Sequence, residues 1–126
     1  KLKVKDLPDA WNAEVKSFTG KEPTTNAQGC LQDVHWFVGK FGYYPAYSLG
    51  HMMAAQINDR MKRDIQNLPE LVRQGQFTPM RNWLNEKIHA KGRLQRSDIL
   101  MEEVTGAKLS VAPLINHLEN RYLHAA

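Results

Sequence analysis

Side chains able to do chemistry gather in one segment of the sequence, residues 29–50. Asp33 and His35 stand two positions apart, and a carboxylate and an imidazole can exchange protons or contribute to a metal site. The segment also holds tyrosines, whose hydroxyls can donate to an oxyanion, and glycines, which let the backbone approach a ligand closely. This mixture is untypical of an ordinary core element and marks a candidate functional site. The tyrosines are Tyr43, Tyr44 and Tyr47.

The same segment carries two motifs with fixed spacing. They are Gly29-x-x-Gln32-Asp33-x-His35-Trp36 and Phe41-Gly42-Tyr43-Tyr44-Pro45-x-Tyr47-x-Leu49-Gly50. Together they resemble the C-terminal signature of the carboxypeptidase Taq family, whose members are zinc-dependent metallocarboxypeptidases. Looser similarity extends along nearly the whole chain. The resemblance therefore implies that the chain corresponds to the last part of such an enzyme and that it is mostly helical.

The resemblance places the zinc site outside this chain. The family holds zinc with a His-Glu-x-x-His helix and a later glutamate, but none of the five histidines here is followed by Glu-x-x-His. Asp33 and His35 alone are too few ligands for zinc. We therefore expect no metal ligand in this chain, and zinc bound by other residues of the parent enzyme. No role is assigned to His51, His89, His117 or His124.

A zinc carboxypeptidase needs hydrogen-bond donors that stabilise the tetrahedral oxyanion. In helical zinc peptidases of this general architecture, a histidine and a tyrosine about a dozen residues later face the metal. That similarity implies that His35 and Tyr47 are the catalytic pair. Tyr44 and Tyr43 are the alternatives, and we expect them to contact the substrate. A packed core residue is the competing interpretation for both His35 and Tyr47.

Asp33 has two possible roles. On a regular helix, side chains two positions apart diverge by about 200°, which predicts that Asp33 and His35 do not pair directly. Asp33 would then act indirectly, without touching the metal, by accepting a hydrogen bond from a zinc-bound imidazole or by fixing the loop. Alternatively, it merely caps a turn. Trp36 is expected to be a packing anchor, and Cys30 a buried and inert thiol.

Composition excludes several classes of protein. The 126 residues and 42% hydrophobic content suit a folded domain. A single cysteine favours a reducing compartment, and we expect the cytoplasm. No run approaches the roughly 20 apolar residues of a membrane span. The formal charge of +4 permits weak attraction to polyanions, but the basic residues are scattered, so we expect no nucleic-acid partner.

Helical periodicity dominates the chain, and we find no convincing strand. The expected N-caps are Asp6, Asn67, Ser97 and Ser110, and the expected helix ends are Gly20, Gly75, Gly92 and Gly106. The expected helices cover 7–19, 31–36, 45–64, 69–74, 78–91, 98–105 and the residues after 110. Phe18 shares the face by which the first helix is expected to pack. We expect one core, formed by Leu7, Trp11, Val15, Leu49, Met52, Met53, Ile57, Met61, Leu114, Ile115, Leu118 and Tyr122.

These observations predict an all-α fold of about six or seven helices, a single helical region over 1–126 that is the C-terminal portion of a larger zincin-like carboxypeptidase. The implied activity is metal-dependent release of single C-terminal amino acids from peptides. This chain would supply one wall of the active-site groove and be inactive alone. Its expected partners are a peptide substrate, the N-terminal part of the same enzyme and a second copy in a homodimer. The competing hypothesis is a non-enzymatic helical module that binds a protein or polyanion.

Overall fold

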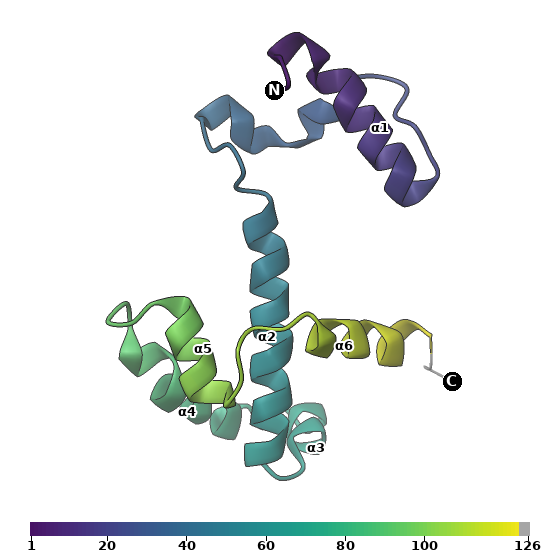
Figure 1. Ribbon diagram of the computed structural model, residues 1–126. Coiled ribbons are helices and arrows are strands. Elements are labelled where there is room, and N and C mark those ends of the chain that lie inside the picture. Colours follow the sequence, from purple (N-terminus) through teal and green to yellow (C-terminus); the bar gives the residue numbers. More distant parts are fainter. Residues whose placement is uncertain (124–126) are drawn as a thin grey trace. The chain divides into compact units, whose positions relative to one another are not determined.

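The computed structural model describes residues 1–123. Across these residues every regular element is a helix and none is a strand, which confirms the predicted all-α class (Figure 1). The chain divides into two compact units, residues 1–45 and 46–126. Each unit is considered by itself.

In the first unit, α1 (Leu7–Thr19) has the predicted bounds. It ends at Gly20, which adopts a left-handed conformation with φ of 72° and donates its N–H to the Lys16 carbonyl. The predicted cap is wrong, because the Asp6 side chain makes no capping hydrogen bond. Phe18, predicted to pack, is 83% exposed.

The motif segment forms two short 3₁₀ helices, Cys30–Gln32 and Val34–Val38, where one helical piece was predicted. Asp33 separates them with a non-helical backbone, φ −82° and ψ 88°. The first of these helices contacts α1. Gly29 allows this close approach, since a Cβ there would lie 2.9 Å from Asn12 Oδ1.

The second unit is built on α2 (Pro45–Asp64), whose bounds match the prediction. Proline suits a helix start because its missing N–H would be unpaired there anyway. Of the four predicted N-caps, those at Asp6, Asn67 and Ser97 show no side-chain capping hydrogen bond. The fourth is present, because Ser110 Oγ accepts the Ala112 N–H at 3.2 Å. The remaining elements are α3 (Leu68–Arg73), α4 (Thr78–Lys87), the 3₁₀ helix His89–Lys91, α5 (Ser97–Thr105) and α6 (Ala112–Tyr122).

A hydrophobic cluster joins four helices of this unit. It consists of Met61 on α2, Leu68 on α3, Trp83 on α4 and Val104 on α5. The prediction of one core was wrong in its membership: Leu49, Ile115, Leu118 and Tyr122 are all exposed, and α1 contributes no fully buried residue. Periodicity identifies the apolar face of a helix but not whether another element covers it.

One polar side chain is buried at the junction of α2, α5 and the segment before α6. Gln56 is 6% exposed. Its Nε2 lies 2.9 Å from Thr105 Oγ1 and 3.1 Å from the carbonyl oxygens of both Ala107 and Lys108. Its Oε1 accepts the Ser110 N–H at 3.0 Å. Because each polar atom is hydrogen-bonded, this burial is tolerated and ties the two segments together.

Candidate functional site

Asp33 and His35 pair directly, which corrects the prediction that they diverge. Asp33 is 4% exposed, and its Oδ1 accepts the His35 backbone N–H at 3.1 Å. The same oxygen lies 2.7 Å from His35 Nδ1. The divergence argument assumed a regular helix, but Asp33 stands before the 3₁₀ helix as its N-cap. A capping side chain folds over the first turn, so one carboxylate oxygen reaches both groups.

Two tyrosine rings pack around the His35 imidazole. The Tyr43 ring centroid lies 4.8 Å from that of His35 with an interplanar angle of 35°, and the Tyr44 centroid lies 6.0 Å away at 72°. The chain reverses between them because Gly39 and Gly42 both adopt φ of 70°. The first unit therefore brings the predicted carboxylate, imidazole and two of the three predicted phenols together.

Tyr47 lies in the first turn of α2, as predicted, and is 52% exposed. It belongs to the second unit, whereas His35 belongs to the first. The predicted pairing of His35 with Tyr47 therefore stays a prediction.

The indole of Trp36 packs edge-on against that of Trp11, with ring centroids 5.6 Å apart at 89°. This contact agrees with the predicted packing role. Cys30 is a free thiol and 4% exposed, so its predicted burial is confirmed. Sequence reasoning missed two supporting residues. Gln32 Nε2 donates to the Ala27 carbonyl, and Lys40 Nζ lies 5.2 Å from the Tyr43 ring centroid. Gln32 is a fixed position of the first motif, which could have identified it; Lys40 carries no such signal.

The other histidines that the structure describes lie in the second unit. His51 and His117 line a hollow of about 340 Å³ against α2 in the second unit. His89 Nδ1 lies 2.8 Å from Asn85 Oδ1 on the same helical stretch. His124 lies outside the described residues.

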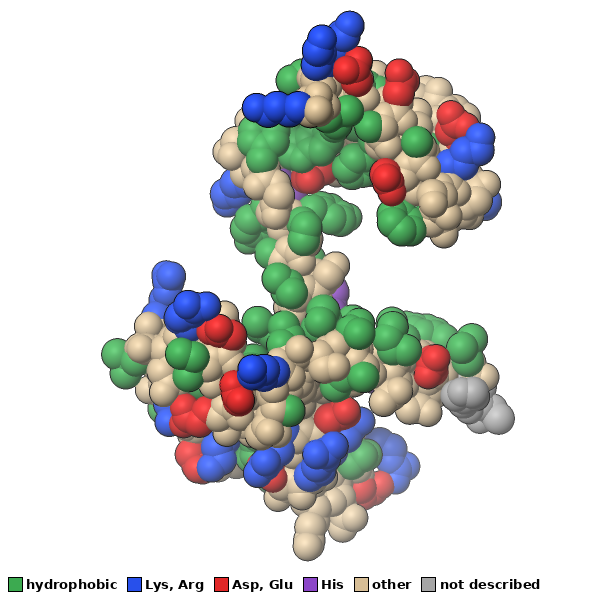
Figure 2. All heavy atoms as spheres, in the orientation of Figure 1, with side chains coloured by type: hydrophobic (Ala, Val, Ile, Leu, Met, Phe, Trp, Pro, Cys, Tyr) green, Lys and Arg blue, Asp and Glu red, His purple; other side chains and the backbone are tan. Residues whose placement is uncertain are grey.

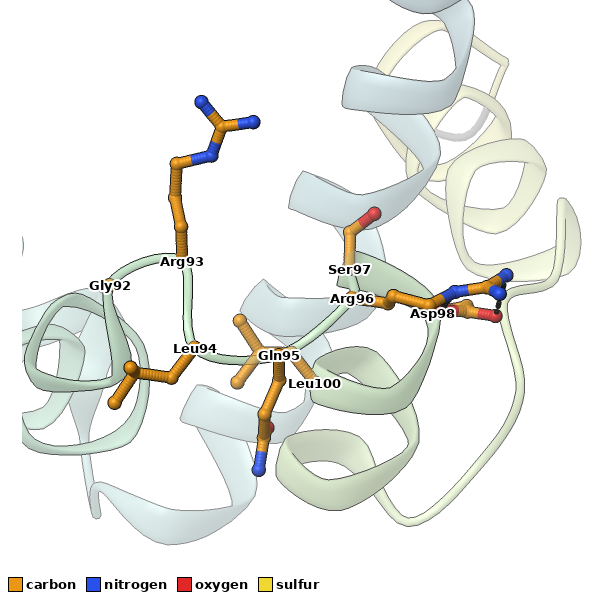
Figure 3. Close-up of a pocket in the computed structure, with 8 residues that line it drawn as sticks. All are labelled: Gly92, Arg93, Leu94, Gln95, Arg96, Ser97, Asp98 and Leu100. Atoms are coloured by element: carbon orange, nitrogen blue, oxygen red, sulfur yellow. Dashed lines mark hydrogen bonds and ion pairs between the residues drawn. The ribbon is translucent and has the colours of Figure 1, made fainter.

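A separate hollow of about 760 Å³ lies along the loop between the 3₁₀ helix His89–Lys91 and α5 (Figure 3). Arg93 and Leu94 project from the loop on different sides, and Arg96 turns back to pair with Asp98 at 3.0 Å. The Arg96 guanidinium lowers the pKa of Asp98 below its ordinary value. The hollow thus offers one ion pair that is already neutralised and no cluster of reactive groups.

Charges on the second unit alternate in sign (Figure 2). Hydrogen bonds from Arg60, and next from Trp83, lower the pKa of Asp64, and the hydrogen bond from Lys91 lowers that of Glu103. The Glu86 carboxylate raises the pKa of the neighbouring Lys87. These pairs neutralise part of the basic surface of this unit. The ion pairs of this unit are Arg60–Asp64, Arg73–Glu70, Lys87–Glu86, Lys91–Glu103 and Arg96–Asp98.

Residues 1–122 match the family model of the carboxypeptidase Taq (M32) metallopeptidases. The chain belongs to the M32 family. It is 41% identical over 121 residues to carboxypeptidase 1 of Bacillus subtilis and 34% identical over 122 residues to thermostable carboxypeptidase 1 of Pyrococcus furiosus. These alignments cover 96% and 97% of this chain and 24% of each relative.

Solved structures of M32 relatives agree with the fold. The crystal structure of BsuCP is 41% identical with a TM-score of 0.87, and metallocarboxypeptidase 1 of Trypanosoma cruzi is 37% identical with a TM-score of 0.90. The matches cover 98% and 97% of this chain, and 25% and 26% of those chains. The chain thus spans about a quarter of the length of the M32 relatives it matches.

The M32 family consists of metallopeptidases. Within residues 1–123, no group of three or more His, Cys, Asp or Glu side chains could hold a metal ion. These residues therefore offer no ligand set that fits the family's metal. Among the same residues, no helix is both long enough and apolar enough to cross a membrane.

Proposed function

We propose that this chain forms one wall of the active-site groove of a metal-dependent carboxypeptidase that releases single amino acids from the C-termini of peptides. The observation that carries the proposal is the cluster of Asp33, His35, Tyr43 and Tyr44 inside the segment that matches the M32 family. Peptide hydrolysis passes through a tetrahedral oxyanion, and preorganised hydrogen-bond donors stabilise it. An imidazole and neighbouring phenols are donors of the required type.

Within this wall we assign the catalytic role to His35 and Tyr47. Each would donate a hydrogen bond to the oxyanion, and Tyr44 and Tyr43 would contact the peptide beside it. Two observations support this assignment. His35 is held by a polar partner, Asp33. Tyr47 lies at the start of α2, where its side chain is half exposed.

The remaining parts of the active site would come from elsewhere in the parent enzyme. We propose that zinc is the metal, held by residues outside this chain, and that the chain alone is inactive. The exposed apolar side chains of the first unit, such as Phe37 and Phe41, support contact with further protein. That protein would be the rest of the same polypeptide and a second copy in a homodimer. We place the enzyme in the cytoplasm because the one cysteine of this chain is a free thiol.

The test uses the complete enzyme and compares His35→Ala with Tyr47→Phe. If both residues act in the transition state, each variant should lower kcat by about 10² to 10³, with little change in KM. Metal content should be unchanged, since neither residue is proposed as a ligand. Near-normal turnover in Tyr47→Phe beside a large loss in Tyr44→Phe would show that the wrong tyrosine was chosen. Loss of metal in His35→Ala would contradict the proposed role of His35.

A second test uses the chain of 126 residues alone. Metal analysis should find no stoichiometric zinc, and a carboxypeptidase assay should detect no turnover of a blocked dipeptide. Stoichiometric metal together with turnover would show that the metal site lies in this chain after all.

A further inference from the structure

The Asp33 carboxylate lies against one particular ring nitrogen of His35. Asp33 Oδ1 lies 2.7 Å from His35 Nδ1, a distance typical of a charge-assisted hydrogen bond. An ionised carboxylate can only accept, so the proton between these two atoms belongs to the imidazole. The neutral ring is therefore the Nδ1–H form, and Nε2 is the nitrogen on the far side of this pair.

The orientation of Asp33 is itself well determined. Its side chain is almost fully buried and its Oδ1 also accepts the His35 backbone N–H at 3.1 Å. One oxygen that binds both the backbone and the ring of the same residue sets the ring's position relative to its own main chain. A buried carboxylate with two donors is also far less costly than one with none.

The Tyr43 ring restrains the imidazole from its face. The ring centroids are 4.8 Å apart and the two planes are tilted by 35°, which is a tilted stacking contact. The Lys40 Nζ, 5.2 Å from the Tyr43 ring centroid, adds a cation–π contact that helps to hold this ring. Such stacking needs the aromatic ring of Tyr43 and not its hydroxyl.

We propose that Asp33 and Tyr43 are positioning residues: they hold the His35 imidazole in the Nδ1–H form and aim Nε2 at the reacting carbonyl. This rests on the proposed function, and it changes the role of Tyr43 from substrate contact to aromatic support. Neutral His35 accepts at Nε2 and protonated His35 donates there, so all exchange with the substrate runs through that one atom.

The first experiment observes the ring directly in the complete enzyme. Nitrogen NMR of histidine-labelled protein in alkaline buffer, with His35 assigned by loss of its signals in His35→Ala, should show the Nδ1–H form. In Asp33→Ala the proton should redistribute toward Nε2, whereas Asp33→Asn, which keeps an acceptor oxygen, should retain more of the Nδ1–H form. An Nε2–H form in the unmodified enzyme, or no change in Asp33→Ala, would overturn the role of Asp33.

The second experiment separates kcat from KM. Asp33→Ala should lower kcat about 10- to 100-fold with KM little changed, as for other groups that orient a catalytic side chain. Tyr43→Leu should lower kcat about 3- to 10-fold, and Tyr43→Phe should restore it, because the ring contact is retained. Tyr122→Leu, the same substitution at a tyrosine of α6 that is 70% exposed, is the matched control and should be silent.

The outcomes distinguish this proposal from the proposed function. If Tyr43→Phe is as damaging as Tyr43→Leu, the hydroxyl matters and the aromatic support is overturned. If His35→Ala leaves turnover unchanged, the catalytic role of His35 fails, while the nitrogen NMR still decides by itself whether Asp33 positions the ring. Circular dichroism of each variant identifies any that fail to fold, for which Asp33→Asn and Tyr43→Phe remain decisive.

Discussion

The two units of the chain bury different kinds of side chain. In the first unit, residues 1–45, the buried side chains are Cys30 and the carboxylate Asp33, and the motif lies in short 3₁₀ helices. In the second unit, longer helices enclose an apolar cluster that includes Trp83 and Met61. One unit has the features of a reactive surface and the other those of a scaffold.

The difference shows that an irregular backbone can bring together side chains that a regular helix would separate. A regular α-helix would have separated the Asp33 and His35 side chains, whereas the break between two 3₁₀ helices lets them pair at 2.7 Å. Regular helices instead supply the apolar faces from which a core is assembled. Variants that lower the stability of one unit without affecting the other would sharpen this comparison, and variants that affect both would break it.

The largest effect is expected from Trp83→Ala in the second unit. Trp83 is 8% exposed and its Nε1 donates to Asp64 at 2.9 Å. Removing the indole should lower the free energy of unfolding by about 3–5 kcal/mol, through lost burial and a cavity. Trp83→Phe, which keeps a ring but loses the hydrogen bond, should cost less. Amide hydrogen exchange should show lost protection in residues 46–126 only; equal loss in residues 1–45 would break the distinction between units.

A smaller effect is expected at the buried amide of the second unit. In Gln56→Met the Ser110 N–H loses its acceptor and the Ala107 and Lys108 carbonyls lose the Gln56 amide, although Thr105 Oγ1 still donates to Ala107. Loss of the hydrogen bonds of this buried amide should reduce the free energy of unfolding by about 1–3 kcal/mol. Denaturant unfolding measures this, with Gln66→Met, at an exposed glutamine, as the neutral control. A neutral Gln56→Met would mean that this junction does not contribute to stability.

Substitution of Gly29 should affect the first unit instead. A Cβ in Gly29→Ala would lie 2.9 Å from Asn12 Oδ1 and 3.3 Å from the Thr25 carbonyl oxygen. We therefore expect the free energy of unfolding to fall by about 1–2 kcal/mol. Adding Asn12→Ala should recover part of it. Gly50→Ala on α2 is the matched control, because its Cβ meets nothing within 4 Å. That variant should stabilise the helix by about 0.5–1 kcal/mol. Equal losses in both variants would contradict the close approach at Gly29.

The smallest effect concerns Asp64, whose pKa is lowered from its ordinary value of 3.8 by hydrogen bonds from Arg60 and then Trp83. A carboxyl with a lower pKa in the folded state adds stability above its unfolded pKa, and this stability is lost as the pH falls through the folded pKa. The free energy of unfolding of Asp64→Asn should therefore be lower than that of the unmodified chain at neutral pH, and the two values should converge in strong acid. High salt should shrink the difference. A difference that grows in acid would have the wrong sign.

Much of the local structure follows from residues whose own geometry is restrictive. Pro45 begins α2, and Gly20 and Gly106 end α1 and α5 in left-handed conformations, all as predicted. The side-chain caps at Asp6, Asn67 and Ser97 were wrong, because a polar residue before a helix permits a cap without requiring one. The family and the candidate segment could also be predicted from the sequence, since both depend on residue identity at fixed spacing.

The contacts between side chains could not be predicted from the sequence. Pairing of Asp33 with His35, stacking of Tyr43 on the imidazole and the exposure of Phe18 all depend on where the backbone turns and on which elements cover a face. Periodicity and spacing describe a chain along one dimension. The distances that turn a carboxylate and an aromatic ring into supports for one histidine exist only after the chain has folded back on itself.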